Sequence, residues 1–189
     1  MRLLKPSLFA LLCLPLLWLG RAAWQGQLGA NPIEAGLREL GHWAIRLLLL
    51  TLLLGAVARL SGQLWPLALR RMVGLFAFAY ASIHLLVYVG LDQFGEPLAI
   101  LEDLRYRPYI LLGMSAWLIL LLLAVSSWRA SQRWLGPYWG WLHRSIYLAT
   151  PLALAHALMV AKTISYSALA YTALFLLILV LRWLIPSRT

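Results

Sequence analysis

Six long apolar segments limit what this chain can fold into. A membrane-spanning helix needs roughly 20 mainly apolar residues, and only helices and closed barrels satisfy every backbone polar group inside a bilayer. The segments are Ser7–Trp24, Trp43–Ala58, Met72–Leu91, Tyr109–Trp128, Ile146–Ala161 and Tyr166–Ile185. The sequence therefore predicts an all-α fold, a polytopic membrane helix bundle of about six transmembrane helices.

Composition agrees with a membrane protein. Of 189 residues, 63% are hydrophobic and 12% charged, whereas soluble domains are about half apolar and a quarter charged. The polar stretches Gly62–Arg71, Asp92–Pro108 and Arg129–Trp141 are short enough to be connections. We therefore expect one membrane domain, residues 1–189, without a separate soluble catalytic domain.

Cysteine content excludes several kinds of site. The one cysteine, Cys13, lies in an apolar run, so internal disulfides, thiolate metal clusters and covalent c-type haem are excluded. The first apolar run follows Arg2 and Lys5 and also resembles a signal peptide with a cleavage site near Ala22–Ala23. Because five more spans follow, a retained first helix is the favoured interpretation.

Basic residues at the ends of the spans predict the orientation, because cytoplasmic loops are enriched in Lys and Arg. With a cytoplasmic N-terminus, ten of them lie inside and five outside, while all six acidic residues lie outside. The inner set is Arg2, Lys5, Arg59, Arg70, Arg71, Arg129, Arg133, Arg144, Arg182 and Arg188. We therefore expect an N-in/C-in topology, and attribute the net charge of +10 to topology rather than to nucleic-acid binding.

Two histidines within the predicted spans carry the main functional hypothesis. His84 lies 13 residues beyond Arg71 and His156 lies 12 beyond Arg144, which places them about 20 and 18 Å into the membrane at about 1.5 Å per residue. Both helices run outward, so the imidazoles are expected at nearly equal depth. That arrangement suits axial ligation of one haem from both faces, with His84 and His156 as the iron ligands. The alternative is that each histidine makes an ordinary interhelical hydrogen bond.

The other two histidines are weighed separately. His143 stands 13 residues before His156, which on a straight helix puts it on a different face. It is a candidate ligand of a second haem, or part of a flavin or quinone site, or an interfacial histidine. His42 is interpreted as an interfacial residue or a neighbour of a haem propionate.

Three arginines are candidate cofactor-binding residues. Arg46 lies about one turn inside its helix and could pair with a haem propionate, although snorkelling would also account for it. Arg70 and Arg71 could bind a flavin phosphate, although topology accounts for most such cytoplasmic arginines. No glycine-rich dinucleotide fingerprint is present.

Several segments resemble one family closely. They are residues 69–93 (LRRMVGLFAFAYASIHLLVYVGLDQ), 100–114 (ILEDLRYRPYILLGM) and 126–156 (SSWRASQRWLGPYWGWLHRSIYLATPLALAH), with residues 31–51 before them. The chain resembles, over nearly its whole length, the MsrQ/YedZ family of haem-binding membrane subunits. This family belongs to the wider ferric-reductase-like transmembrane group, which includes NADPH oxidases.

The resemblance implies a multi-pass subunit of the bacterial inner membrane that carries haem b and FMN. It would pass electrons from the quinone pool to a periplasmic molybdopterin enzyme, its heterodimer partner, which repairs oxidised methionines. The family's histidines match His84, His143 and His156. The wider group commonly has a second histidine on the third helix, which this chain lacks, so one or two haems remain alternatives. No catalytic residue is expected in this chain.

Two other classes of protein compete with this interpretation. A small transporter would be expected to carry carboxylates or discontinuous helices within its spans, and no Asp or Glu lies in any predicted span. A structural membrane anchor without a redox cofactor would not need two histidines at matched depth.

Overall fold

The computed structural model describes residues 3–161 and 165–184, and within them it contains helices and no β-strand. Arg2, Ile185 and Arg188, which entered the predictions above, lie outside the described residues. The elements are α1 (Leu4–Trp24), α2 (Pro32–Ser61), α3 (Trp65–Val87), the π-helix η1 (Tyr88–Asp92), α4 (Pro97–Tyr106), α5 (Pro108–Val125), α6 (Arg129–Leu135), α7 (Tyr138–Arg144), α8 (Ile146–Val160) and α9 (Tyr166–Leu184).

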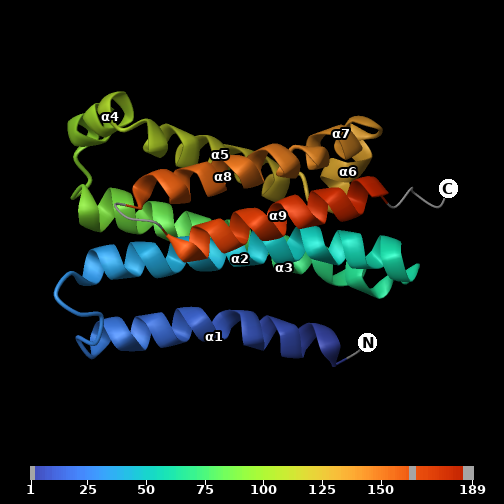
Figure 1. Ribbon diagram of the computed structural model, residues 1–189, viewed down its shortest axis with the longest axis horizontal. Coiled ribbons are helices and arrows are strands. Elements are labelled where there is room, and N and C mark those ends of the chain that lie inside the picture. The colour runs from blue at the N-terminus through green and yellow to red at the C-terminus, as the bar shows by residue number, and fades with distance from the viewer. Residues whose placement is uncertain (1–2, 162–164, 185–189) are drawn as a thin grey trace.

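Six of these helices lie side by side along the longest axis of the molecule and alternate in direction (Figure 1). Among the described residues, five elements are long and apolar enough to cross a membrane: α1, α2, α3 with η1, α5 and α9. The sixth, α8, has 15 residues and runs along α5. The predicted all-α membrane bundle is confirmed.

Helix ends differ from the predicted ends where capping residues extend a helix beyond its apolar run. α2 begins at Pro32, because the side chain of Asn31 accepts a hydrogen bond from the backbone N–H of Glu34. It continues to Ser61 and is capped by Gly62, whose φ of 68° is the left-handed conformation that commonly ends a helix. α3 begins at Trp65, so most of the expected connection 62–71 is helical.

The other two expected connections also contain helices. Proline stands in the first turn of both α4 and α5, where it has no hydrogen bond to lose. On α4 the buried carboxylate of Asp103 accepts a hydrogen bond from Tyr88 (2.8 Å) and pairs with Arg107 (3.1 Å). The bond from Tyr88 links α4 to η1, which continues α3.

The centre of the bundle is α2, which contacts α1, α3, α8 and α9. Its leucines Leu48, Leu49 and Leu52 are 1–2% exposed, and the hydrophobic core is built around them. Many leucines on the outer helices are exposed, for example Leu122 on α5 and Leu176 on α9. A helix apolar on both its inner and outer faces is expected where lipid replaces water.

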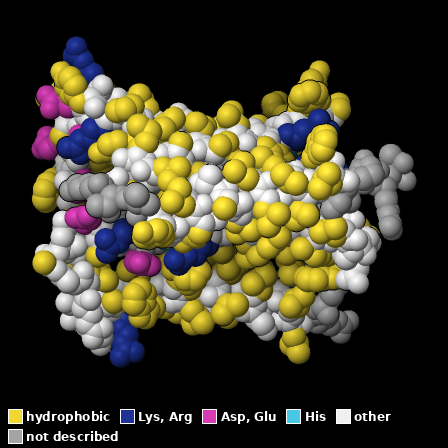
Figure 2. Space-filling model, viewed as in Figure 1, with side chains coloured by type: hydrophobic (Ala, Val, Ile, Leu, Met, Phe, Trp, Pro, Cys, Tyr) yellow, Lys and Arg dark blue, Asp and Glu magenta, His cyan; other side chains and the backbone are white. Residues whose placement is uncertain are grey.

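Charge is unequal between the two ends of the bundle. The start of α1 and the end of α9 lie at one end, and α4 lies at the other (Figure 1). Glu34, Glu39, Asp92, Glu96, Glu102 and Asp103 all belong to segments at the α4 end. Figure 2 shows apolar side chains over the middle of the visible face and the acidic ones at the α4 end. Lys5, Arg59, Arg70, Arg71, Arg129, Arg133, Arg144 and Arg182 belong to segments at the opposite end.

This arrangement makes the orientation testable. We predict that the α4 end is periplasmic and the opposite end, with both chain termini, is cytoplasmic, because positive charge is retained on the cytoplasmic side. Alkaline phosphatase inserted between Phe94 and Gly95 should be active, whereas the same enzyme fused after Leu184 should be inactive. A fusion after Leu184 that is active would refute the orientation.

Candidate functional site

His84 and His156 lie beside each other near the α4 end of the bundle. His84 is in the last turn of α3, and His156 lies four residues before the end of α8. Their ring centroids are 6.2 Å apart and the ring planes are nearly perpendicular, at 88°. Two residues 72 positions apart in the sequence therefore form one local site, as their matched depth had indicated.

Each of these rings is oriented by one hydrogen bond to a neighbouring helix. Nδ1 of His84 lies 2.9 Å from the carbonyl oxygen of Leu37 on α2. Nδ1 of His156 lies 2.7 Å from the carbonyl oxygen of Tyr109 on α5. A carbonyl only accepts, so Nδ1 carries the proton in both rings and Nε2 keeps its lone pair. Histidine with Nδ1 held by a backbone carbonyl is prepared to bind a metal through Nε2.

The separation of the two rings suits one metal between them. Metal–imidazole bonds are about 2.0 Å long, so two imidazoles on opposite sides of one metal have ring centroids about 6 Å apart. The observed separation of 6.2 Å agrees with that value. Among the described residues, no group of three or more His, Cys, Asp or Glu could hold a metal ion. Two nitrogen ligands at this separation are what a haem iron needs from a protein, because its other four ligands come from the porphyrin.

His143 is held differently from these two histidines. Its Nε2 lies 3.1 Å from the hydroxyl oxygen of Ser126, and its ring stacks on Trp139 with centroids 4.1 Å apart. The Ser126 hydroxyl donates to the carbonyl of Leu123 (3.3 Å), so His143 is the donor in the first bond. Nε2 of His143 is therefore protonated, whereas Nε2 is free in the other two rings.

The surroundings of His143 determine whether its imidazole is charged or neutral. Burial lowers its pKa below the ordinary value of 6.5, the positive charge of Arg70 lowers it further, and an interaction with the backbone of Ser126 acts in the opposite direction. His143 is therefore neutral at pH 7. It belongs to the end of the bundle away from α4, apart from the His84–His156 pair.

The predicted residues Arg46 and His42 meet on α2 in an aromatic cluster. The Arg46 side chain donates to the hydroxyl of Tyr171 on α9 (2.8 Å) and lies 4.9 Å from the ring centre of Trp43. His42 makes an edge contact with the same tyrosine, at 5.7 Å between ring centroids. Tyr171 was not identified from the sequence, because nothing in its own segment indicates a partner on α2.

Arg70 and Arg71 are consecutive but face different surroundings. Arg70 packs beside Gly55 of α2 and is close enough to Tyr147 and Arg182 to interact with their charges. Arg182 donates to the hydroxyl of Tyr147 (2.6 Å). Sequence reasoning missed this contact, since Arg182 was interpreted only as a topology residue.

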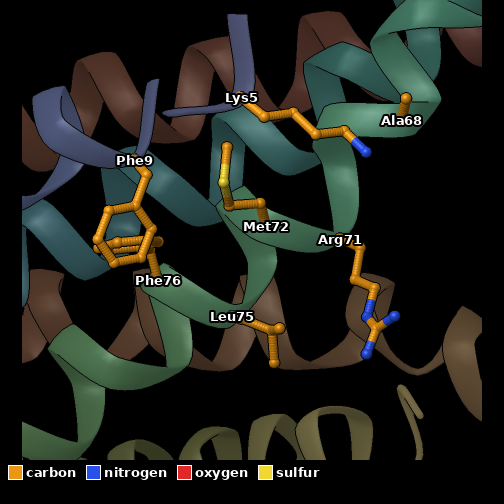
Figure 3. A pocket seen from close by; sticks show the side chains of 7 residues that line it. All are labelled: Lys5, Phe9, Ala68, Arg71, Met72, Leu75 and Phe76. Atoms are coloured by element: carbon orange, nitrogen blue, oxygen red, sulfur yellow. The ribbon is translucent and has the colours of Figure 1, made fainter. Parts of the chain in front are cut away.

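Arg71 instead borders a groove between α1 and α3 (Figure 3). The groove is lined by Lys5, Phe9, Ala68, Arg71, Met72, Leu75 and Phe76. The residues that line it include neither a histidine nor a carboxylate. Its residues come from the starts of α1 and α3, so it is separate from the His84–His156 site.

Comparison with known proteins agrees with the membrane fold. Residues 40–154 match the family described as ferric reductase like transmembrane component. The matched segment contains His42, His84 and His143 and ends two residues before His156. It covers more than half of the chain and defines its class, a ferric-reductase-like membrane protein.

Three relatives that share one name identify the family within this class. The chain is 43% identical to the protein-methionine-sulfoxide reductase heme-binding subunit MsrQ of Azospira oryzae, over 98% of this chain and 79% of the relative. It is 43% identical to that of Rhodospirillum rubrum, over 98% and 89%. With that of Caulobacter vibrioides it shares 41% identity, over 89% and 80%. The chain belongs to the MsrQ family.

The surroundings of His143 allow a direct test. We predict that Arg70→Gln raises the pKa of His143 towards 6.5, because it removes a positive charge that disfavours the imidazolium. The measurement is an NMR pH titration of ring-labelled histidine, with the His143 signal assigned from a His143→Gln variant. Arg71→Gln is the matched control, since Arg71 borders the groove between α1 and α3 and is not among the groups that shift the pKa of His143. An unchanged pKa in Arg70→Gln would contradict this account of the site.

Proposed function

We propose that this chain is a membrane electron-transfer subunit that holds one haem b between His84 and His156. The observation that carries the proposal is the paired orientation of the two rings, each with its Nδ1 bonded to a backbone carbonyl and their centroids 6.2 Å apart. The relatives are named as heme-binding subunits, which supports the same cofactor. When bound, the haem supplies an iron centre that is reduced and reoxidised by one electron.

The residues around the iron favour electron transfer over oxygen chemistry. Two histidines would fill both axial positions, so no coordination site stays open for oxygen. Their hydrogen bonds to the carbonyls of Leu37 and Tyr109 fix the rings and make Nε2 a stronger ligand. In this role the chain's own residues position the cofactor, and they catalyse no substrate conversion.

The position of the site indicates where electrons leave. Tyr109 lies in the first turn of α5 and Leu37 in the second turn of α2, so the site lies close to the α4 end of the bundle. That end carries all six acidic residues and the α4 helix. We propose that a periplasmic molybdopterin methionine sulfoxide reductase subunit docks there and accepts electrons for the repair of oxidised proteins.

Electrons would enter from the opposite, cytoplasmic end of a bacterial inner-membrane protein. By family resemblance, we propose the quinone pool as the donor and FMN as a second cofactor. Arg70, close to Tyr147 and Arg182, is the better candidate for a flavin phosphate, whereas Arg71 lines the separate groove. His143 is a candidate residue of this inner site, as ligand of a second haem or as a flavin contact. Arg46 is the candidate for pairing with a propionate of the outer haem.

Histidine replacements test the haem proposal. We predict that His84→Ala and His156→Ala each lose most of the low-spin haem b absorption, because each removes one axial ligand and leaves a cavity. His143→Ala should retain most of that signal, since His143 belongs to α7, at the end of the bundle away from the His84–His156 pair. The measurement is the reduced-minus-oxidised spectrum at equal amounts of folded protein, because loss of a ligand also lowers stability.

His42→Ala is the control for this series. It removes a histidine from α2 that contacts Tyr171 and should leave the low-spin spectrum intact. Full low-spin absorption in both His84→Ala and His156→Ala would refute the proposed ligands.

A second prediction concerns the division of labour. The purified chain with a chemical reductant should not reduce methionine sulfoxide, because its one cysteine, Cys13, lies within α1 and cannot act as an exposed thiol. Addition of the periplasmic catalytic subunit should produce turnover together with reoxidation of the haem. Both would be followed in one cuvette by product formation and absorbance. Turnover by the chain alone would contradict the proposal.

A further inference from the structure

The same three-part arrangement occurs twice in the bundle. In the first copy, the ring of His84 lies against Gly41 and is bonded to the carbonyl of Leu37. In the second, the ring of His156 lies against Gly113 and is bonded to the carbonyl of Tyr109. The histidine follows its carbonyl partner by 47 residues in both copies. Every member of the second copy lies 72 positions after its counterpart.

The glycine in each copy stands four residues after the residue that supplies the carbonyl. In an α-helix these two positions lie on the same face, one turn apart. A side chain at the glycine position would therefore project over the carbonyl that the histidine must reach. The absence of a Cβ leaves room for the imidazole ring on that turn.

The two copies differ in how much room remains. A Cβ added at Gly41 would lie 3.5 Å from Nδ1 and Cε1 of His84, which is an ordinary contact. A Cβ added at Gly113 would lie 2.9 Å from Nδ1, 3.0 Å from Cε1 and 3.2 Å from Cγ of His156. The crowded atoms include the nitrogen that bonds to Tyr109, so the ring cannot move away without disturbing that bond.

We propose that Gly113 is a positioning residue for the haem-ligating ring of His156 and that no larger residue can replace it, whereas the space beside Gly41 accepts a Cβ at ordinary contact distance from His84. The inference rests on the proposed function, since the rings are positioned for the haem iron. Small residues also promote close helix packing in membranes. At both glycines, however, the atoms nearest to an added Cβ belong to the histidine ring and not to a neighbouring backbone.

Three alanine substitutions separate ring positioning from helix packing. Gly113→Ala should lose most of the low-spin absorption and shift the haem midpoint potential, because His156 is displaced from the iron. Gly41→Ala should keep the low-spin spectrum. Gly74→Ala is the matched control, since its added Cβ would lie 3.5 Å from Thr51, in the same α2–α3 interface as Gly41 but away from both histidines.

A second measurement removes the possibility that Gly113→Ala merely folds poorly. In a His156→Gly variant, added imidazole should enter the vacated space and restore the low-spin spectrum. In the double variant with Gly113→Ala, restoration should require about tenfold more imidazole, a factor equivalent to about 1.4 kcal/mol. With Gly41→Ala or Gly74→Ala in the same background, the required concentration should not change.

The outcomes are distinct. Low-spin loss confined to Gly113→Ala, together with the weaker imidazole rescue, supports the inference. An unchanged spectrum and potential in Gly113→Ala overturns it, as does equal loss in all three alanine variants. Absence of haem from the unmodified protein would instead refute the proposed function itself.

Discussion

The hydrogen bonds from His84 and His156 to backbone carbonyls are the interactions on which the site depends. An imidazole within a membrane helix bundle has no water to bond, so both of its nitrogens need partners. A helical carbonyl already accepts one hydrogen bond within its own helix but has a second lone pair. Leu37 and Tyr109 offer that lone pair at 2.9 and 2.7 Å. With Nδ1 satisfied in this way, each ring has one unpaired nitrogen, and the two rings lie 6.2 Å apart.

Much of this could be predicted from the sequence, because helix geometry is fixed. Counting residues from Arg71 and Arg144 gave nearly equal depths for the two histidines, and the structure places the rings together. The apolar runs likewise predicted the helices of the bundle. Helix ends were less predictable, because Asn31 and Gly62 extend α2 well beyond its apolar run.

The partners of the histidines could not be predicted from the sequence. The carbonyl that each ring uses is a backbone atom 47 residues away, and no side chain identifies it. No internal repeat is evident in the sequence, although the structure contains the same arrangement twice. The repeated positions carry different residues, Leu37 and Tyr109, because their contribution is a carbonyl and not a side chain. The two copies share only a glycine and a histidine, and four such positions are too few for a recognisable sequence repeat.

The two ends of the bundle serve different electrostatic roles. At the end away from α4, His143 donates Nε2–H to Ser126. Its burial, together with the nearby charge of Arg70, lowers its pKa and keeps it neutral. At the α4 end, His84 and His156 present free Nε2 atoms close to a surface that carries the acidic residues. A neutral histidine binds a metal through the ring nitrogen that lacks a proton and donates a hydrogen bond through the nitrogen that carries it. The difference is therefore set by whether the neighbouring group is a carbonyl at Nδ1 or a hydroxyl at Nε2. Residue type alone cannot distinguish these two cases, and the geometry of the bundle does.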